Sequence, residues 1–210
     1  MNQLEFSDAL RRLADGAALE IDRTIEAPLF QYLELLRRWN RTMNLTALPL
    51  DPPADEAIER LMIEPLLVAR GVDLSAARWF DIGSGNGSPA IPIKLARPAL
   101  QLTMVESKSR KAVFLREVSR ALGLSAAVDN ARFESLADRP ELSGALDLVT
   151  IRAVRIDASL IALCAFLLRS SGQLVLLGYR GGDPAGFRRS GDLGLFVRST
   201  WNKIANNVSS

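Results

Sequence analysis

The chain has 210 residues, of which 48% are hydrophobic and 24% charged, so it can bury one full core, and its composition excludes a disordered, collagen-like or coiled-coil protein. It contains no histidine and one cysteine, which excludes a Ser-His-Asp triad, a Cys-His pair and the zinc sites built from those residues. The net charge of +2 is uneven, because residues 1–75 hold 8 arginines and 13 acids (−5) whereas residues 76–210 hold 18 basic and 11 acidic residues (+7).

Arginine supplies 22 of the basic residues and lysine four. Arginine binds phosphate through two parallel hydrogen bonds and stacks on bases, so the bias fits an RNA partner, although a GC-rich genome explains it equally well. The longest apolar run, residues 160–168, is far shorter than the roughly 18 to 20 residues that span a membrane. The first residues lack the basic start and apolar stretch of a secretion signal. We therefore expect a cytoplasmic protein without membrane segments.

The first third of the chain has the pattern of helices. In residues 28–40, apolar side chains recur at spacings of three and four after a proline that suits a helix start, which predicts an amphipathic helix. Residues 50–55 predict a turn, and residues 57–70 predict another helix, interrupted or kinked at Pro65. We therefore predict an N-terminal helical region over residues 1–75.

From residue 77 onward, short apolar runs alternate with stretches of helical spacing, which is typical of a parallel α/β sheet with right-handed crossovers. The predicted strands are residues 78–82, 101–106, 126–130, 146–152 and 173–178, and the predicted helices are residues 90–96, 108–122 and 156–168. Residues 193–201 predict a last strand or hairpin, which could form an antiparallel edge of the sheet, and residues 202–210 predict a frayed tail. We expect residues 76–210 to form one domain with Cys164 in its core.

A glycine-rich loop directly follows the first predicted strand. Asp81 precedes a G-x-G-x-G run at residues 83–87, and Ser88 and Pro89 lead into the next helix. Glycines let the backbone approach a ligand, and open α/β sheets bind ligands outside the carboxyl ends of their strands. A second acid, Glu106, ends the next strand, where a carboxylate can accept from both hydroxyls of a ribose. We therefore expect this loop to line a ligand pocket.

The glycine spacing differs from that of a dinucleotide-binding loop. That loop reads G-x-G-x-x-G and places a pyrophosphate on a helix N-terminus, whereas the third glycine here comes one residue early. Asp81 would repel a pyrophosphate but suits a ligand that bears an amine. The pattern is similar to the S-adenosylmethionine loop of class I methyltransferases. An NAD-dependent oxidoreductase is a weaker alternative, and a loop that only turns the chain is another.

Five stretches, in order, resemble the RsmG family, also called GidB, of bacterial enzymes that methylate N7 of a guanosine in 16S ribosomal RNA. They include the distinctive patterns W-N-x-x-x-N-L-T and G-x-G-x-P-x-I-P. The stretches are residues 36–47, 80–92, 106–118, 130–134 and 152–154. The resemblance implies an α/β fold of the class I S-adenosylmethionine-dependent methyltransferase type, Rossmann-like with a mostly parallel sheet and preceded by N-terminal helices.

The chain departs from the family pattern at several positions. Where the family reads R-H-x-x-D-S-L, residues 60–66 put Leu61 for the histidine, glutamate for the aspartate and Pro65 for the serine. Ala90 replaces a glycine, and Ile151 replaces a serine. The resemblance therefore supports cofactor binding more strongly than it supports the RNA target.

The resemblance implies roles in cofactor binding for several residues. The backbone of Gly83 and Gly85, with Asp81 beside them, is expected to hold the methionine end of S-adenosylmethionine, and Ser88 to touch the cofactor. Glu106 is expected to hold the ribose hydroxyls. The alternatives are a carboxylate that caps the loop, for Asp81, and a surface carboxylate at a strand end, for Glu106.

The resemblance also implies roles near the adenine and the reaction centre. Phe133 and Glu134 are expected to line the adenine, although Phe133 as a plain core residue is an alternative. Arg132 and Arg152 are expected to act in catalysis, on the target nucleotide or on the carboxylate of the cofactor, so that Arg152 also counts as a cofactor-binding residue. Salt bridges on a solvated face are the alternative for both arginines.

The predicted function is transfer of a methyl group from S-adenosylmethionine to N7 of a guanosine in 16S rRNA. N7 carries a free lone pair, so the absence of a histidine base is compatible with this reaction. The alternatives are a methyltransferase acting on another RNA or a small molecule, and a non-catalytic ribosome-binding paralogue. We expect 16S rRNA or the small-subunit particle as partner, no metal, and a monomer. The basic residues after Glu106 either contact RNA phosphate or form a solvated face; they are Lys108, Arg110, Lys111 and Arg116.

Overall fold

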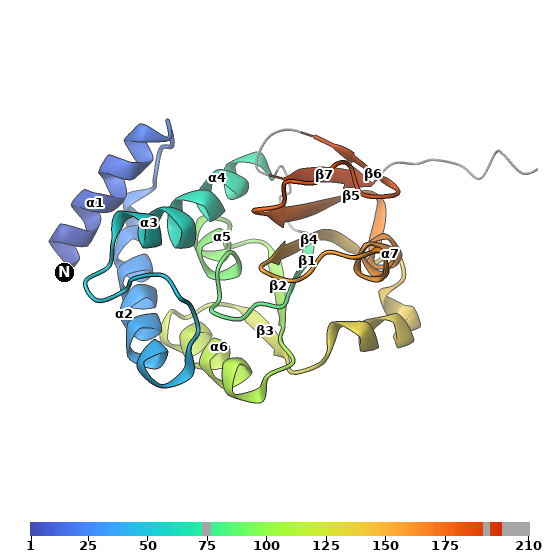
Figure 1. The fold of residues 1–210 in the computed structure, drawn as a ribbon, viewed down its shortest axis with the longest axis horizontal. Coiled ribbons are helices and arrows are strands. Elements are labelled where there is room, and N and C mark those ends of the chain that lie inside the picture. The colour runs from blue at the N-terminus through green and yellow to red at the C-terminus, as the bar shows by residue number, and fades with distance from the viewer. Residues whose placement is uncertain (73–76, 191–193, 199–210) are drawn as a thin grey trace, which may run out of the picture.

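The computed structural model describes residues 1–72, 77–190 and 194–198. Its centre is a seven-stranded sheet with the strand order β3-β2-β1-β4-β5-β7-β6 (Figure 1). The strands are β1 (Arg78–Ile82), β2 (Gln101–Val105), β3 (Ala126–Asp129), β4 (Leu146–Arg152), β5 (Leu168–Leu177), β6 (Phe187–Arg189) and β7 (Leu195–Arg198). Strands β1 to β5 pair in parallel, whereas β7 pairs antiparallel with β5 and β6. The predicted α/β fold with a mostly parallel sheet is confirmed.

Four predicted strands agree with the observed ones to within one residue at each end. The exception is β5, which begins at Leu168 rather than at residue 173, because Leu168 pairs with Leu146 ahead of an irregularity in the register. The short strand β6 was not predicted. The predicted last strand contains β7, which pairs antiparallel as expected but lies between β5 and β6, so that β6 rather than β7 forms this edge of the sheet. Residues 193 and 199–201, and the predicted tail at residues 202–210, lie outside the described residues.

The helices divide between the two faces of the sheet. They are α1 (Gln3–Gly16), α2 (Glu26–Met43), α3 (Asp55–Ile58), α4 (Glu64–Gly71), α5 (Ala90–Ala96), α6 (Ser109–Ala121) and α7 (Ala158–Leu167), with the short helices η1 (Arg23–Ile25), η2 (Glu59–Ile63), η3 (Phe133–Asp138) and η4 (Pro140–Leu142). Helices α1 to α6 lie on one side of the sheet in Figure 1 and α7 on the other. Successive strand residues point to opposite faces of the sheet. Trp79 accordingly belongs to one buried apolar cluster, which we call the first, and Phe80 to a second.

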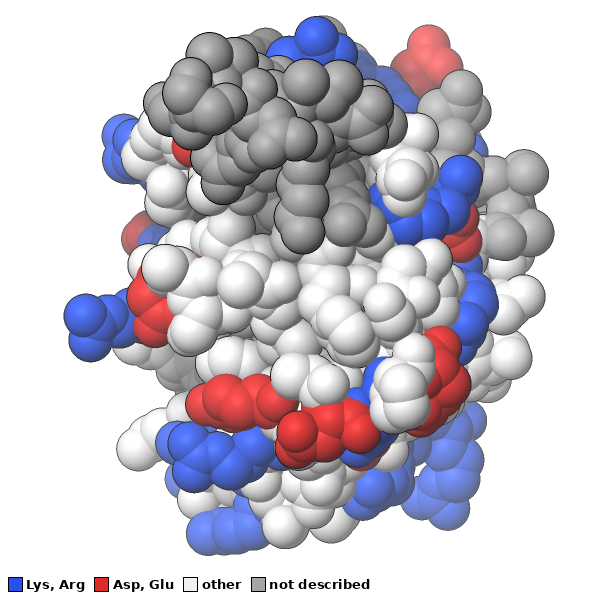
Figure 2. All heavy atoms as spheres, turned by 90° about the vertical axis from the view of Figure 1, so that its right-hand side faces the viewer, with Lys and Arg blue, Asp and Glu red and all other residues white. Residues whose placement is uncertain are grey.

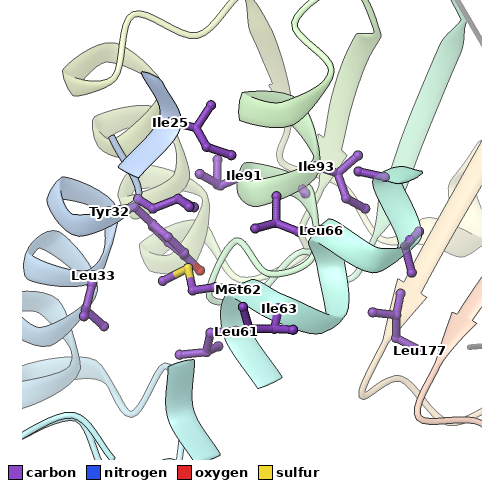
Figure 3. Packing of buried hydrophobic residues seen from close by; sticks show 14 of the residues in the cluster. Ile25, Tyr32, Leu33, Leu61, Met62, Ile63, Leu66, Ile91, Ile93 and Leu177 are labelled. Atoms are coloured by element: carbon purple, nitrogen blue, oxygen red, sulfur yellow. The ribbon is translucent and has the colours of Figure 1, made fainter. Parts of the chain in front are cut away.

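The N-terminal helices and the sheet share one apolar cluster. Figure 3 shows Tyr32 of α2 and Met62 of η2 packed near Ile91 of α5, while Ile63 of η2 lies towards Leu177 of β5. Each of these side chains is buried. Burial of apolar area at about 25 cal/mol per Å² is the main stabilising contribution, so the helices and the sheet stabilise each other. None of the helices in the described part of the chain is long and apolar enough to cross a membrane.

The predicted helix at residues 57–70 is a continuous helical run, α3–η2–α4, from Asp55 to Gly71. Its middle part, η2, has π-type hydrogen bonding just before Pro65. Proline has no N–H, so the carbonyl of Leu61, four residues earlier, loses its usual helical donor. The sequence indicated an interruption here, and the structure accommodates it as a π-type turn, a feature often found at functional sites.

Candidate functional site

The glycine-rich loop, residues 83–89, connects β1 to α5 at the carboxyl edge of the sheet. Gly83 has a φ of +72°, and a Cβ there would lie 2.5 Å from Val154 Cγ2. Gly85 has a φ of +50°. A larger residue at either position would be strained, which explains the glycines. The Gly83 N–H donates to the Val105 carbonyl at 2.9 Å and so fixes the loop to the end of β2.

The N-terminal helices hold the same loop from the side. The Tyr32 hydroxyl of α2 donates to the Asn86 carbonyl at 2.8 Å, and Asn86 Oδ1 accepts from the Ser88 N–H at 2.9 Å. Tyr32 is fully buried, and this burial raises its pKa, so the hydroxyl stays a neutral donor. The helical region therefore helps to position the loop.

Asp81 is fully buried at the end of β1. Its Oδ1 accepts from the Thr150 hydroxyl of β4, which itself accepts from Trp79 Nε1 at 2.9 Å. Its Oδ2 has no hydrogen-bond partner among the described residues. Burial raises the pKa of Asp81 to about 6, against the opposing effect of the Thr150 hydrogen bond. A buried, unpaired carboxylate oxygen is costly, so Oδ2 suits a ligand that brings a donor or a positive charge.

Glu106 follows β2 and is buried. Its Oε2 accepts from the Gly85 N–H at 2.9 Å, and its Oε1 accepts from the Lys108 N–H at 2.8 Å. Asn130 Nδ2 donates to the Glu106 carbonyl at 2.8 Å and holds the backbone beneath the carboxylate. Each carboxylate oxygen can accept more than one hydrogen bond, so the capacity to receive ribose hydroxyls remains.

Arg152 lies at the end of β4, where burial lowers the pKa of its guanidinium. Its Nη2 pairs with Glu64 Oε2, and its Nη1 donates to the Arg60 carbonyl. The same Nη1 lies 3.2 Å from Ser88 Oγ. Arg152 therefore ties the sheet to the π-type turn and to the glycine-rich loop at once. A buried charge needs such partners, because leaving it unpaired costs several kcal/mol, of the order of 3 to 5.

Ser88 uses its hydroxyl within the protein. Ser88 Oγ donates to the Leu61 carbonyl at 3.0 Å, and this carbonyl is the one that Pro65 leaves without a helical donor. Ser88 is buried and also contacts Arg152. The side chain expected to touch the cofactor thus fastens the loop to the helical run α3–η2–α4.

The residues expected near the adenine lie apart from this network. Arg132 immediately precedes η3, and both it and Glu134 are exposed; their Nη2 and Oε1 atoms are 3.5 Å apart. Phe133 is half-buried and packs against the second apolar cluster with α7. Within the described part of the chain, no hydrogen bond or ion pair joins these three side chains to the glycine-rich loop.

Hydrogen bonds join two pairs of the predicted site residues, Gly85 with Glu106 and Ser88 with Arg152. The partners of the others include residues that the sequence analysis did not select, since Asp81 accepts from Thr150. Glu64 and Asn130 lay inside stretches that resemble a family pattern and could have been selected there. Tyr32 and Thr150 had no such signal, since a buried tyrosine on an amphipathic helix predicts core packing.

The donor and acceptor set fits S-adenosylmethionine. Asp81 Oδ2 is a buried acceptor without a partner among the described residues, which suits an amine, and Glu106 follows β2 at a strand end where a carboxylate can accept from ribose hydroxyls. Gly83 and Gly85 keep the loop free of side chains where the backbone would meet the ligand. The arrangement can therefore bind and orient a cationic nucleoside.

The comparison with protein families matches residues 25–184 to a sequence model of GidB, described as rRNA small subunit methyltransferase G. A ribosomal RNA small subunit methyltransferase G of Xylella fastidiosa is 41% identical over 160 residues, which cover 76% of this chain and 71% of the relative. The protein of the same name from Stenotrophomonas maltophilia is 41% identical over 170 residues, which cover 80% of this chain and 74% of the relative.

The fold is also similar to that of solved methyltransferases. A putative methyltransferase of Escherichia coli, yhhF, superposes with a TM-score of 0.53 at 16% identity, covering 66% of this chain and 87% of the other. At this identity the likeness concerns the fold alone, which is that of the class I S-adenosylmethionine-dependent methyltransferases.

Proposed function

Because this chain belongs to the GidB family of small-subunit rRNA methyltransferases, we propose that it transfers a methyl group from S-adenosylmethionine to N7 of a guanosine in 16S ribosomal RNA. The observation that carries the proposal is that two acids flank the glycine-rich loop at the carboxyl edge of the sheet: Asp81, whose buried Oδ2 has no partner among the described residues, and Glu106, which accepts from the Gly85 N–H. The family supplies the substrate class, and the site supplies the means to bind the cofactor.

When bound, S-adenosylmethionine supplies a methyl group that its sulfonium already activates. Asp81 Oδ2 would accept from the amine of the cofactor, and the Gly83 and Gly85 backbone would lie against its methionine end. Glu106 would accept from the ribose hydroxyls while still fixing the Gly85 amide. Phe133 and Glu134 would border the adenine. The assignments of Asp81 and Glu106 rest on motif positions and on the contacts described above, and those of Phe133 and Glu134 rest on motif positions alone.

Guanine N7 presents a lone pair and has no proton to lose, so the site needs no general base. The chain contains no histidine, and its task in this reaction is placement. Holding two reactants in the right geometry contributes roughly 7 to 11 kcal/mol towards lowering a barrier. The contacts of Tyr32, Ser88 and Arg152 with the loop or its neighbours serve that rigidity.

In this proposal Arg152 would stand at the reaction centre, and Arg132 would contact the substrate from the exposed surface. Arg152 already has Glu64 as a partner, so the acid that this chain carries in place of the family's aspartate still serves an arginine at the strand end. Arg132 is 79% exposed and available to RNA. The departures at Leu61 and Pro65 lie in the helical run behind this pair.

The test is transfer of labelled methyl from S-adenosylmethionine to 16S rRNA and to 30S particles that lack their native modification, with identification of the product nucleoside. We expect 7-methylguanosine. Transfer to neither substrate, with cofactor binding intact by calorimetry, would point to another RNA or a small molecule. Loss of both methyl transfer and cofactor binding would point to a protein that acts only by binding the ribosome.

The same proposal places the protein in the cytoplasm, where ribosomal RNA is modified, and treats it as a monomer. Sedimentation of the purified chain with and without 16S rRNA tests the second point. A single species near 23.0 kDa without RNA is the expected result, and a stable dimer would contradict it.

A further inference from the structure

A pocket of about 520 Å³ lies between the end of α2 and the start of α6. The two helices pack antiparallel, since Gln31 Nε2 donates to the Ala121 carbonyl at 3.3 Å and Arg38 pairs with Glu117. The last turn of α2 therefore meets the first turn of α6, and the two helices lie side by side in Figure 1. We call this hollow, lined by residues 42–44 and 108–111, the α2–α6 pocket.

The α2–α6 pocket is lined by cations and by no acid. Lys108 and Arg110 are exposed and Lys111 is half-buried, and the described residues give none of these side chains a hydrogen-bond or ion-pair partner. Elsewhere arginines commonly pair with acids, as Arg37 does with Asp51. Like charges held close together without a counter-charge attract anions.

The α2–α6 pocket adjoins the glycine-rich loop. Lys111 Nζ lies 3.9 Å from the position that a Cβ on Gly85 would occupy. Gly85 also donates to Glu106, the acid placed at the cofactor ribose. An RNA base delivered to a cofactor held beside Glu106 would bring its own sugar and phosphates towards this side of the loop.

We propose that the α2–α6 pocket binds the phosphodiester backbone of the RNA strand that carries the target guanosine. This inference rests on the proposed function. The volume falls within the range of roughly 300 to 1,000 Å³ that small ligands occupy, so the pocket can admit part of a nucleotide. Arg110 can contact a phosphate bidentately, while Lys108 and Lys111 act as point charges.

The face of the molecule shown in Figure 2 has a different character. Its centre is uncharged, and acidic and basic residues are interleaved along its lower part. Interleaved charges give little net attraction for a polyanion. The α2–α6 pocket differs from this face because its like charges cluster beside the glycine-rich loop.

The test compares Lys108→Ala, Arg110→Ala and the double variant with wild type in the full chain. Binding to unmodified 16S rRNA is measured between about 50 and 200 mM salt, and cofactor affinity is measured by calorimetry without RNA. We expect each substitution to weaken RNA binding about tenfold at low salt and to lower the slope of log affinity against log salt by about 1. Cofactor affinity stays at the wild-type value, and Lys108→Arg restores RNA binding.

Arg78→Ala is the matched control, because Arg78 is exposed at the start of β1, at the opposite edge of the sheet. It should leave both affinities unchanged. Wild-type RNA affinity and salt slope in the double variant would overturn the proposal, as would loss of cofactor affinity with RNA binding intact. If the wild type transfers no methyl group to 16S rRNA, the proposed function fails. If the wild type and the double variant bind RNA equally, the proposal for the α2–α6 pocket fails, which is a separate result.

Discussion

At the scale of single residues, Asp81 combines an unpaired buried oxygen with a pKa raised to about 6. The folded state binds the proton more readily than the unfolded state, whose carboxyl titrates near 3.8. The sign follows: as pH rises from about 4 to about 6, ionisation of Asp81 lowers the free energy of unfolding, and above that range the loss is constant. The folded protein is therefore less stable when Asp81 is ionised than when Asp81 is protonated.

We expect Asp81→Asn to stabilise the folded protein at pH 7 to 8 by up to about 3 kcal/mol, since the pKa rises from 3.8 to about 6 and a shift of one pKa unit corresponds to about 1.36 kcal/mol. The same change should weaken cofactor binding, because an amide cannot pair with an ammonium as a carboxylate does. Urea unfolding and calorimetry measure the two effects. The exposed Asp138→Asn serves as control, and a loss of stability in Asp81→Asn would contradict the argument.

Cofactor affinity should depend on pH through the same group. Below pH 6, protonation of Asp81 removes the charge that faces the amine, so the wild-type dissociation constant should rise as pH falls from 7 to 5. Asp81→Asn should show a flat profile over that range. A variant that keeps the wild-type pH dependence would assign the effect to another group.

The ion pair between Glu64 and Arg152 allows a second test at the scale of single residues. Glu64→Gln leaves a largely buried guanidinium without its carboxylate. Glu64 is about one-third exposed, so solvent screens part of the loss, and we expect a cost of about 1 to 2 kcal/mol in urea unfolding. Methyl transfer should fall as well, because Arg152 also contacts the loop through Ser88.

Glu56→Gln provides the matched control, since its exposed ion pair with Arg60 is 3.8 Å long and should contribute less than about 0.5 kcal/mol. Equal stability of the two variants would show that Arg152 finds another partner. Full methyl transfer by Glu64→Gln would separate the pair from the reaction centre.

The residues of the site were predictable to the extent that their local pattern is tied to their role. Asp81, Gly83 and Glu106 occupy strand ends and a tight turn, and the order of strand, loop and helix makes these positions recognisable in sequence. Thr150 was not predictable, because its contact with Asp81 joins β4 to β1 across 69 positions of sequence. Such contacts depend on sheet order, which local periodicity does not contain.

At the scale of elements, helix α2 helps to position the glycine-rich loop through one hydrogen bond. Tyr32→Phe removes the donor to the Asn86 carbonyl and keeps the packed ring. We expect a loss of about 1 to 2 kcal/mol in the free energy of unfolding, together with weaker cofactor binding. Tyr179→Phe is the control, since the Tyr179 ring packs against Phe196 away from the loop. Unchanged cofactor affinity in Tyr32→Phe would mean that this hydrogen bond from α2 does not position the glycine-rich loop for binding.

The strands β1 and β4 were predicted to the residue because their apolar side chains stand in short runs set apart from the neighbouring helical patterns, although Asp81, Asp147 and Thr150 interrupt these runs. The start of β5 was not, because Arg169, Ser170, Ser171 and Gly172 are polar or flexible residues that predict a turn. In the structure they form an irregular segment, with Ser171 at a φ of +66°, after Leu168 has paired with Leu146. A bulge of this kind is decided by tertiary pairing.

At the scale of the whole molecule, the shared apolar cluster argues that residues 1–75 and 76–210 fold as one unit. The cluster includes Leu29, Leu33 and Leu61 from the first part and Trp79 and Leu115 from the second. A fragment of residues 77–210 would expose the apolar face that α2 and η2 cover. We expect it to lack cooperative unfolding, whereas the full chain should unfold in a single transition by circular dichroism in urea. Two separate transitions in the full chain would contradict this expectation.

The hydrogen bonds from Trp79 through Thr150 to Asp81 give the protein an optical readout of its own site. Indole emission shifts with charges placed close to the ring, so it should change when Asp81 ionises or when an ammonium group arrives beside it. The chain has three tryptophans, and a Trp39→Phe, Trp201→Phe variant leaves the fully buried Trp79 as the single fluorophore. Its spectrum should follow cofactor arrival in real time, without a label.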